Sequence, residues 1–213
     1  MSYPSDPELL VLHVLRLKGF VDVDVIAPAS GQPEPVVDAA LQSLSHAGYV
    51  KRREGRIGGW SLTTPGRIEG EKRLAAELDR CGCRAVVERA FEAFVAINQP
   101  FLALCTRWQL RELDGAQVVN DYHDMTYDAQ LIAELDQVDD AVQPICASLA
   151  GALARFGYYN GRFAVARLRV HDGELDWFTK PMIDSYHSVW FELHENLLAT
   201  LNIERLREAG VEA

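Results

Sequence analysis

Residues 49–64 read Tyr-Val-Lys-Arg-Arg-Glu-Gly-Arg-Ile-Gly-Gly-Trp-Ser-Leu-Thr-Thr. Two short runs of strand-forming residues, 50–53 and 57–63, flank Glu54 and Gly55. A glycine at this point can take the positive φ that a compact turn requires. The stretch therefore predicts a β-hairpin, and its lysine and arginines make that hairpin strongly basic.

The segments around the hairpin have helical periodicity. Residues 7–19 start with proline and glutamate, carry leucines and valines on one face and end at a glycine. From Pro33 the apolar residues recur at helical spacing until Gly48, which predicts another helix with a glycine stop. Residues 22–30 predict a short helix that Pro28 distorts. Thr64 and Pro65 have the residue types of an N-cap and a first helical position, so a new helix is expected there.

Three groups of residues resemble the MarR-type winged-helix family: Ala40 to Arg52, then Gly55-Arg56, then Trp60 to Arg67. The family pattern is a recognition helix ending in Leu-x-x-x-Gly-(Tyr/Leu)-Val, a basic wing, and Leu-Thr-x-x-Gly opening the next helix. The resemblance covers about residues 7–75, roughly a third of the chain. It implies a winged helix-turn-helix domain in which the helix after Pro33 is the recognition helix.

The remaining two thirds predict helices with no motif that we can assign to a family. The expected segments are a helix from 65 to about 98 with a break near Gly82, ended by Pro100, then helical stretches over 101–113, 129–138, 141–156 and 184–201, with loops between 114 and 124. Residues 161–170 fit a helix or a strand equally well. The fold class is mainly α with a small β-hairpin wing: a winged-helix domain over 1–75 and a helical effector and dimerisation domain over 76–213.

The charge of the hairpin favours contact with double-stranded DNA. Five basic residues lie between positions 49 and 67 against one acid, Glu54. Arginines on such a hairpin can contact phosphates or enter a minor groove, and glutamines on a recognition helix can read adenine edges. The expected DNA contacts are Gln32, Gln42, Ser43, Lys51, Arg52, Arg53, Arg56 and Arg67.

Other charges oppose DNA binding. Glu34 and Asp38 lie on the exposed side of the predicted recognition helix, where they repel phosphates. The chain has a formal net charge of −10, and residues 112–140 contain nine acids and no lysine or arginine, so the later part of the chain is a poor nucleic-acid surface. Two interpretations stay open: a ligand-responsive transcriptional regulator that binds DNA, and a winged-helix interaction or sensor module that does not.

The last predicted helix carries an apolar arc of roughly 200°, wider than one neighbouring helix needs. Such an arc predicts burial in a bundle, a homodimer interface or a position beside a pocket. The aromatic residues after position 100 form a core by default, and they can also line a site for a small apolar or aromatic effector. The residues expected to contact that effector are Trp108, Tyr186, His187, Trp190, Phe191 and His194.

No catalytic signature is present: the sequence has no glycine-rich phosphate loop, no Gly-x-Ser-x-Gly, no His-Glu-x-x-His and no Cys-x-x-Cys. His187 and His194 lie about 10 Å apart along one face, too far to share a metal. We therefore expect no enzyme, cofactor or metal site. The four cysteines are too few for a disulfide framework, and Cys81 and Cys83 are expected to stay reduced, pointing apart on a helix.

The apolar runs are shorter than a bilayer span, and residues 1–8 lack the basic and apolar regions of a signal peptide. A cytoplasmic location is therefore expected. The expected partners are DNA, a small effector and a second copy of the chain, with no membrane.

Overall fold

The structure is a computed structural model that describes residues 2–55, 58–113 and 115–203. The described residues are mainly helical, with two small antiparallel sheets of two strands each. The chain divides into two compact units. The first takes its described residues from 1–87, 151–155 and 195–213, and the second from 88–150 and 156–194. The mainly α class expected from the sequence is thereby confirmed.

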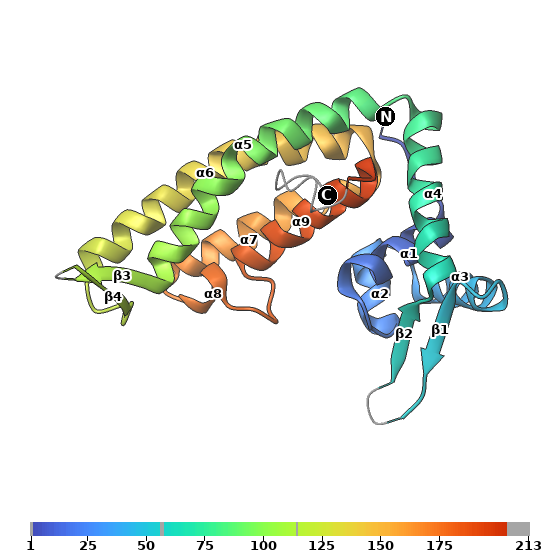
Figure 1. Ribbon diagram of the computed structural model, residues 1–213, viewed down its shortest axis with the longest axis horizontal. Helices are drawn as coiled ribbons and strands as arrows, with labels where there is room; N and C mark the ends of the chain where they lie inside the picture. The colour runs from blue at the N-terminus through green and yellow to red at the C-terminus, as the bar shows by residue number, and fades with distance from the viewer. Residues whose placement is uncertain (1, 56–57, 114, 204–213) are drawn as a thin grey trace. The chain divides into compact units, whose positions relative to one another are not determined.

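Six elements open the first unit (Figure 1): α1 (Pro7–Lys18), α2 (Val23–Ser30), α3 (Glu34–His46), β1 (Val50–Arg53), β2 (Gly59–Leu62) and α4 (Thr64–Cys81). The helices and strands expected in this region are all present. The side chains of Asp6, Asp22 and Thr63 accept hydrogen bonds from the first turns of α1, α2 and α4. These caps set the starting points of the helices because they satisfy amides that have no partner within the helix.

An apolar core joins α1, α2, α3 and β1. Each helix contributes one face of residues at helical spacing, and the fully buried members include Val11, Leu12, Leu15, Ile26, Val37, Leu41, Leu44 and Val50. Trp60 and Leu62 of β2 pack against this core. The hairpin is therefore attached to the helices by burial of its own side chains.

The two strands pair with Val50 opposite Leu62 and Arg53 opposite Gly59. Val21, in the segment between α1 and α2, adds an antiparallel bridge to Trp60, with backbone hydrogen bonds of 3.1 and 2.8 Å. This bridge ties the start of the hairpin's second strand to the segment that precedes α2.

Gly66 lies on α4 directly against the backbone of Tyr49. A Cβ at position 66 would lie 1.8 Å from the carbonyl oxygen of Tyr49, far inside van der Waals contact. The same oxygen accepts a hydrogen bond of 3.0 Å from the amide of Thr63, so it is held in place. This close approach is the physical reason for a glycine at the end of the Leu-Thr-x-x-Gly motif.

The break expected near Gly82 in the helix over residues 65–98 is confirmed, and it divides this stretch into two helices. α4 ends at Cys81, Gly82 adopts a left-handed conformation with φ +61°, and the next helix begins at Arg84. Cys81 and Cys83 form a disulfide across this junction. The expectation of reduced thiols pointing apart is wrong, because Gly82 breaks the helix between the two cysteines.

Seven further elements and one 3-10 turn follow: α5 (Arg84–Gln109), β3 (Leu110–Leu113), β4 (Ala116–Val119), α6 (Met125–Ala152), the turn at Ala154–Phe156, α7 (Tyr159–His171), α8 (Asp176–Thr179) and α9 (Tyr186–Leu201). Pro100 does not end a helix, since α5 continues through it. Its missing amide leaves the carbonyl of Ala96 without a helical partner, and both residues are exposed to water.

The second hairpin was not expected from the sequence. Leu110 pairs with Val119 and Leu113 with Ala116, whereas the sequence predicted helix up to residue 113 and loop beyond it. β3 reads Leu-Arg-Glu-Leu, which has no strand-like alternation and covers only four positions, so the pattern does not distinguish a strand from a helical turn. Across the two helices that the hairpin joins, Arg107 of α5 and Glu134 of α6 form an ion pair, and the helices run side by side (Figure 1).

Residues 161–170, which fitted a helix or a strand, lie in helix α7. Phe163, Ala166 and Val170 are fully buried at spacings of three and four residues, which is the period of a helix. The exposed side of these turns includes Val165, Leu168 and Arg169.

A buried ion pair joins distant segments within the first unit. The guanidinium of Arg155 donates to Glu77 of α4 at 3.0 Å, to Asn196 at 2.6 Å and to Thr200 at 2.8 Å, the last two on α9. The side chains of Arg155 and Glu77 are 2% and 1% exposed. This pair anchors residues 151–155 and the end of α9 in the N-terminal unit, whereas the division expected from the sequence placed all of 76–213 together.

Among the described helices, none has the length and apolar character needed to cross a lipid bilayer.

We predict opposite effects for two glycine-to-alanine substitutions on α4. Gly66→Ala should lower the free energy of unfolding by about 2–3 kcal/mol because the new methyl group collides with the Tyr49 carbonyl. Gly70→Ala meets only Leu12 at 3.6 Å and should raise it by up to about 1 kcal/mol through helix propensity. Chemical denaturation of both variants measures the difference, and equal stabilities would contradict the close approach at Gly66.

Candidate functional site

The basic hairpin presents its charges on two faces. Lys51 and Arg53 alternate with Val50 and Arg52 along β1, so they lie on the face opposite to the buried Val50. Both are exposed, and their partners on β2 are the small residues Ser61 and Gly59. On this outer face, two exposed cations of β1 therefore lie opposite small residues of β2.

Arg52 has a different environment from its neighbours. It lies opposite Trp60, and its guanidinium carbon is 5.8 Å from the centre of the indole ring. A cation over an indole face gains electrostatic stabilisation, which holds the side chain against the hairpin. Arg67 is exposed in the first turns of α4, and Arg56, the remaining basic residue predicted to contact DNA, lies outside the described residues.

The exposed side of α3 is acidic, as the sequence predicted. Glu34, Asp38, Gln42 and Ser43 are exposed there, while Val37, Ala40, Leu41 and Leu44 face the core. Gln32 precedes the helix and is half-buried. Gln42 is thus the better placed of the two glutamines predicted to read bases.

A further carboxylate lies beside α3. Ser43 donates a hydrogen bond of 2.6 Å to Glu8 of α1, and Arg73 of α4 donates to the other oxygen of Glu8 at 2.7 Å. These hydrogen bonds, from Ser43 first and from Arg73 second, lower the pKa of Glu8. The ionised Glu8 pairs with the charge of Arg73 and accepts the hydroxyl hydrogen bond of Ser43. Both groups are therefore less available to a phosphate.

The aromatic residues expected to bind an effector are mostly in the core of the second unit. Trp190 packs on Phe94 and Phe101 at ring distances of 4.6 and 4.2 Å and donates a hydrogen bond of 2.9 Å to Asn98. Tyr186 is completely buried and packs on the same Phe101 at 5.6 Å.

The six predicted effector residues do not form one site. Trp108 belongs to another cluster, with Phe178 and Tyr122 at 4.5 and 5.1 Å. On α9, His194 is 8% exposed and lies 5.4 Å from Phe94, whereas Phe191, three residues earlier, is 47% exposed. The other five residues share the predicted apolar arc of α9, where Tyr186, Trp190 and His194 are buried, His187 is half-buried and Phe191 is exposed.

His187 is half-buried, with its ring 6.2 Å from that of Phe101. Burial lowers the pKa of His187 because the charged imidazolium loses hydration. Its position is that of a neutral histidine at the edge of an aromatic core.

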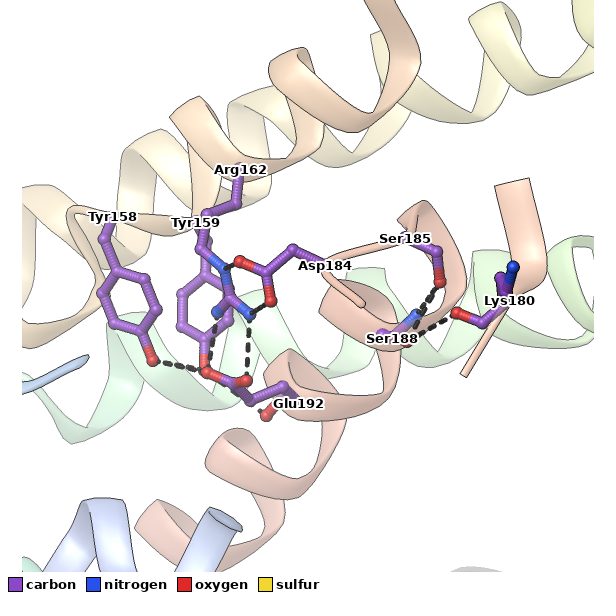
Figure 2. A network of polar contacts seen from close by, with 8 residues as sticks. All are labelled: Tyr158, Tyr159, Arg162, Lys180, Asp184, Ser185, Ser188 and Glu192. Carbon is purple, nitrogen blue, oxygen red and sulfur yellow. Dashed lines mark hydrogen bonds and ion pairs between the residues drawn. The ribbon is translucent and has the colours of Figure 1, made fainter. Parts of the chain in front are cut away.

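A polar network that sequence reasoning missed is centred on Arg162 of α7 (Figure 2). Its guanidinium donates through Nε and Nη2 to Asp184, at 3.1 and 2.9 Å, and through Nη1 and Nη2 to Glu192, at 2.7 and 3.0 Å. Tyr158 donates a hydrogen bond of 2.8 Å to Glu192. One arginine is thus held in a fork by two carboxylates from the segment before α9 and from α9 itself.

The electrostatics of this network favour the ionised forms of its charged groups. Burial alone would lower the pKa of Arg162, but the hydrogen bonds to Glu192 and Asp184 outweigh it and raise that pKa. Burial raises the pKa of Tyr158 well above its ordinary value, and the neighbouring Tyr159 and Glu192 add to this effect. The phenol stays neutral and donates its proton to the carboxylate.

A cavity of about 330 Å³ opens beside this network, lined by Tyr158, Gly161, Arg162, Val165, Trp177 and Asp184. None of the six residues predicted to contact an effector lines it. The network joins Arg162 to Asp184 and Glu192, which come from separate segments and belong to no motif. Only folding brings these side chains together.

Within the described residues, no cluster of three histidine, cysteine or carboxylate groups has the geometry of a metal site. Burial raises the pKa of the thiols of Cys105 and Cys146 to about 12, so both remain protonated and unreactive at neutral pH.

Comparisons of the chain with protein-family models, with curated proteins and with solved structures give no match.

We predict that His187→Gln removes a pH-dependent loss of stability. The pKa of His187 is below its ordinary value of 6.5 in the folded protein, so the unfolded chain takes up the proton first. The free energy of unfolding of the unsubstituted protein should therefore fall, relative to the variant, as the pH drops below 6.5 and through the lowered pKa.

Urea denaturation at several pH values measures this difference. Above about pH 8 the two proteins should differ by a constant amount, since the imidazole is neutral in both states. A difference that stays constant down to about pH 5 would contradict the buried, neutral histidine.

Proposed function

We propose that the chain is a ligand-responsive transcriptional regulator that binds double-stranded DNA through its N-terminal unit, as a homodimer. The observation that carries this proposal is the outer face of the hairpin, where Lys51 and Arg53 are exposed side by side on one face of β1. Two cations on a projecting hairpin match the spacing of a charged phosphate backbone better than scattered surface charges.

The arrangement of the N-terminal elements supports a winged helix of the MarR type. Three helices are followed by two antiparallel strands and a fourth helix, and the bridge between Val21 and Trp60 adds a third backbone segment to the small sheet. In such a domain α3 is the recognition helix and the hairpin is the wing. Gly66 closes the wing onto α4 through its contact with Tyr49.

The acidic charges around α3 predict that phosphate contacts from the hairpin, rather than base contacts from α3, supply most of the affinity for DNA. Glu34, Asp38 and Glu8 place three carboxylates on or beside this helix, and each one weakens the approach of a phosphate. Gln42 remains as an exposed group that can pair with an adenine edge. Modest affinity for one site favours two copies binding together on paired half-sites.

The dimer interface is best sought near the second hairpin. The large apolar side chains exposed there are Leu110, Leu113, Val119, Tyr122 and Met125. A concentration of apolar surface of this kind is typical of a protein contact.

The main prediction concerns the salt dependence of DNA binding. Lys51→Ala/Arg53→Ala should weaken binding to mixed-sequence duplex DNA and reduce the slope of log affinity against log salt concentration by about 2, one for each lost phosphate contact. Fluorescence anisotropy over a salt series measures both quantities.

The matched control is Arg80→Ala/Arg89→Ala, which removes two exposed cations from α4 and α5. It lowers the net charge equally but leaves the hairpin intact, so the slope should stay unchanged. Undetectable binding at low salt, or equal slopes for the two double variants, would rule out the regulator.

We also predict that Glu8→Gln increases affinity for DNA. The substitution removes a carboxylate that repels phosphates and that accepts hydrogen bonds from Ser43 and Arg73. Arg73 keeps its ion pair with Glu69, so the gain comes from the lost negative charge and from the Ser43 hydroxyl. The gain should be on the order of threefold at low salt and vanish at high salt. Glu88→Gln, at an exposed position on α5, is the control and should leave the affinity unchanged.

The acidic side of α3 favours a second candidate, a winged-helix interaction or sensor module that does not bind DNA. In that case the hairpin docks an acidic protein surface. The salt series separates the two functions, because only the regulator requires measurable affinity for duplex DNA.

A further inference from the structure

We propose that the cavity beside the Arg162 network binds a small aromatic cation: a flat apolar molecule that carries one positive charge. The cavity of about 330 Å³ lies at the lower end of the range of small-molecule sites. Its lining brings together the start of α7, the short helix α8 and the segment before α9.

The apolar part of the lining suits a flat ring. Tyr158 and Trp177 provide aromatic surface, and Val165, which is 49% exposed, provides an aliphatic edge. Arg169 covers one side of the Trp177 ring, with its guanidinium carbon 4.5 Å from the ring centre. The indole of this lining residue therefore already accepts one cation.

The charges around the cavity favour a cation over an anion. Arg169 is paired with Glu174, and Lys180 with Asp176, so these two pairs cancel. Arg162 is a single cation shared by two carboxylates, which leaves one unit of negative charge in the network.

That excess charge is accessible at Asp184. The side chain of Asp184 is 57% exposed, whereas the side chain of Glu192 is 11% exposed. Figure 2 shows the Asp184 carboxylate on one side of the guanidinium and Glu192 on the other. All the guanidinium nitrogens of Arg162 already donate to these two carboxylates, so the arginine has little capacity left for an anionic ligand.

Gly161 leaves the cavity open. It lies in the first turn of α7, and a Cβ built there would have nothing within 4 Å. A larger residue can therefore be introduced without a collision with the protein, and it would project into the space that a ligand needs. Glycine lowers the stability of a helix, so its replacement should not unfold α7.

The binding site does not depend on DNA binding, but the role of its ligand as the effector rests on the proposed function. Binding is therefore measured on the full chain without DNA. A failure to bind DNA would not contradict this ligand site, and a failure to bind the ligand would not contradict the proposed contact between the hairpin and DNA.

The probe is N-methylquinolinium, a bicyclic aromatic ring with a permanent charge, titrated by calorimetry. We expect saturable binding, and about tenfold weaker binding of the uncharged ring 1-methylnaphthalene and of the anion 1-naphthoate. Asp184→Asn should remove most of the preference for the cation, because it deletes the accessible carboxylate.

Gly161→Leu should abolish binding by filling the cavity. Its matched control is Gly151→Leu, an exposed helical glycine that also has nothing within 4 Å of its Cβ position, which should bind like the unsubstituted chain. Thermal unfolding of both variants checks that they fold. Absence of N-methylquinolinium binding, equal binding of the three probes, or equal binding by the two leucine variants would overturn the proposal.

Discussion

The ion pair between Arg155 and Glu77 is the interaction on which the N-terminal unit depends most. Removing an arginine and a glutamate from water is costly, and the cost is offset only when their hydrogen bonds are satisfied. Arg155 meets that condition by donating also to Asn196 and Thr200, and its guanidinium lies 3.4 Å from the ring of His13. On Glu77, Oε2 accepts from Arg155, whereas Oε1 has no hydrogen-bond partner among the described residues. The loss of any one partner would leave a buried charge poorly compensated. Segments separated by more than a hundred residues are therefore held in one geometry.

Helix α9 contributes residues to both units. It begins in the second unit, where Trp190 and Glu192 lie, and ends in the first, where Asn196 and Thr200 bind Arg155. Glu192 is a partner of Arg162 at the proposed cation site.

Electrostatics divide the N-terminal unit into an attractive and a repulsive surface. The hairpin carries its cations on a face with small neighbours, while α3 carries acids and borders the ionised Glu8. Since salt screens exposed charges over about 10 Å, the balance between these surfaces depends on ionic strength. In the proposed regulator, a second copy would strengthen such weak attraction, because each copy would add its own phosphate contacts.

The sequence by itself determined the local features whose signals are short-range: the proline at the start of α1 and the glycine stop after α3. The N-cap predicted at Thr64 is wrong by one residue, because the side chain of Thr63 accepts the capping hydrogen bond from Gly66 and Thr64 already belongs to α4. It also predicted that the acids of α3 are exposed, because helical periodicity places them on the side opposite to the apolar residues. It did not predict β3 and β4, because a pattern of four residues is ambiguous between strand and helix. It also did not predict that α5 continues through Pro100, where the carbonyl that loses its helical hydrogen bond is exposed to water.

Only the tertiary structure decided what each face contacts. The wide apolar arc of α9 is compatible with a core, a dimer interface or a pocket, and the structure places Trp190 of that arc in the core against Phe94 and Phe101. Arg162, Asp184 and Glu192 carry no sequence signal, because a polar network is defined by distances between side chains that the chain brings together from separate segments. Periodicity in the sequence predicts which face of a helix a side chain occupies. The residue that this side chain contacts depends on how the whole chain packs.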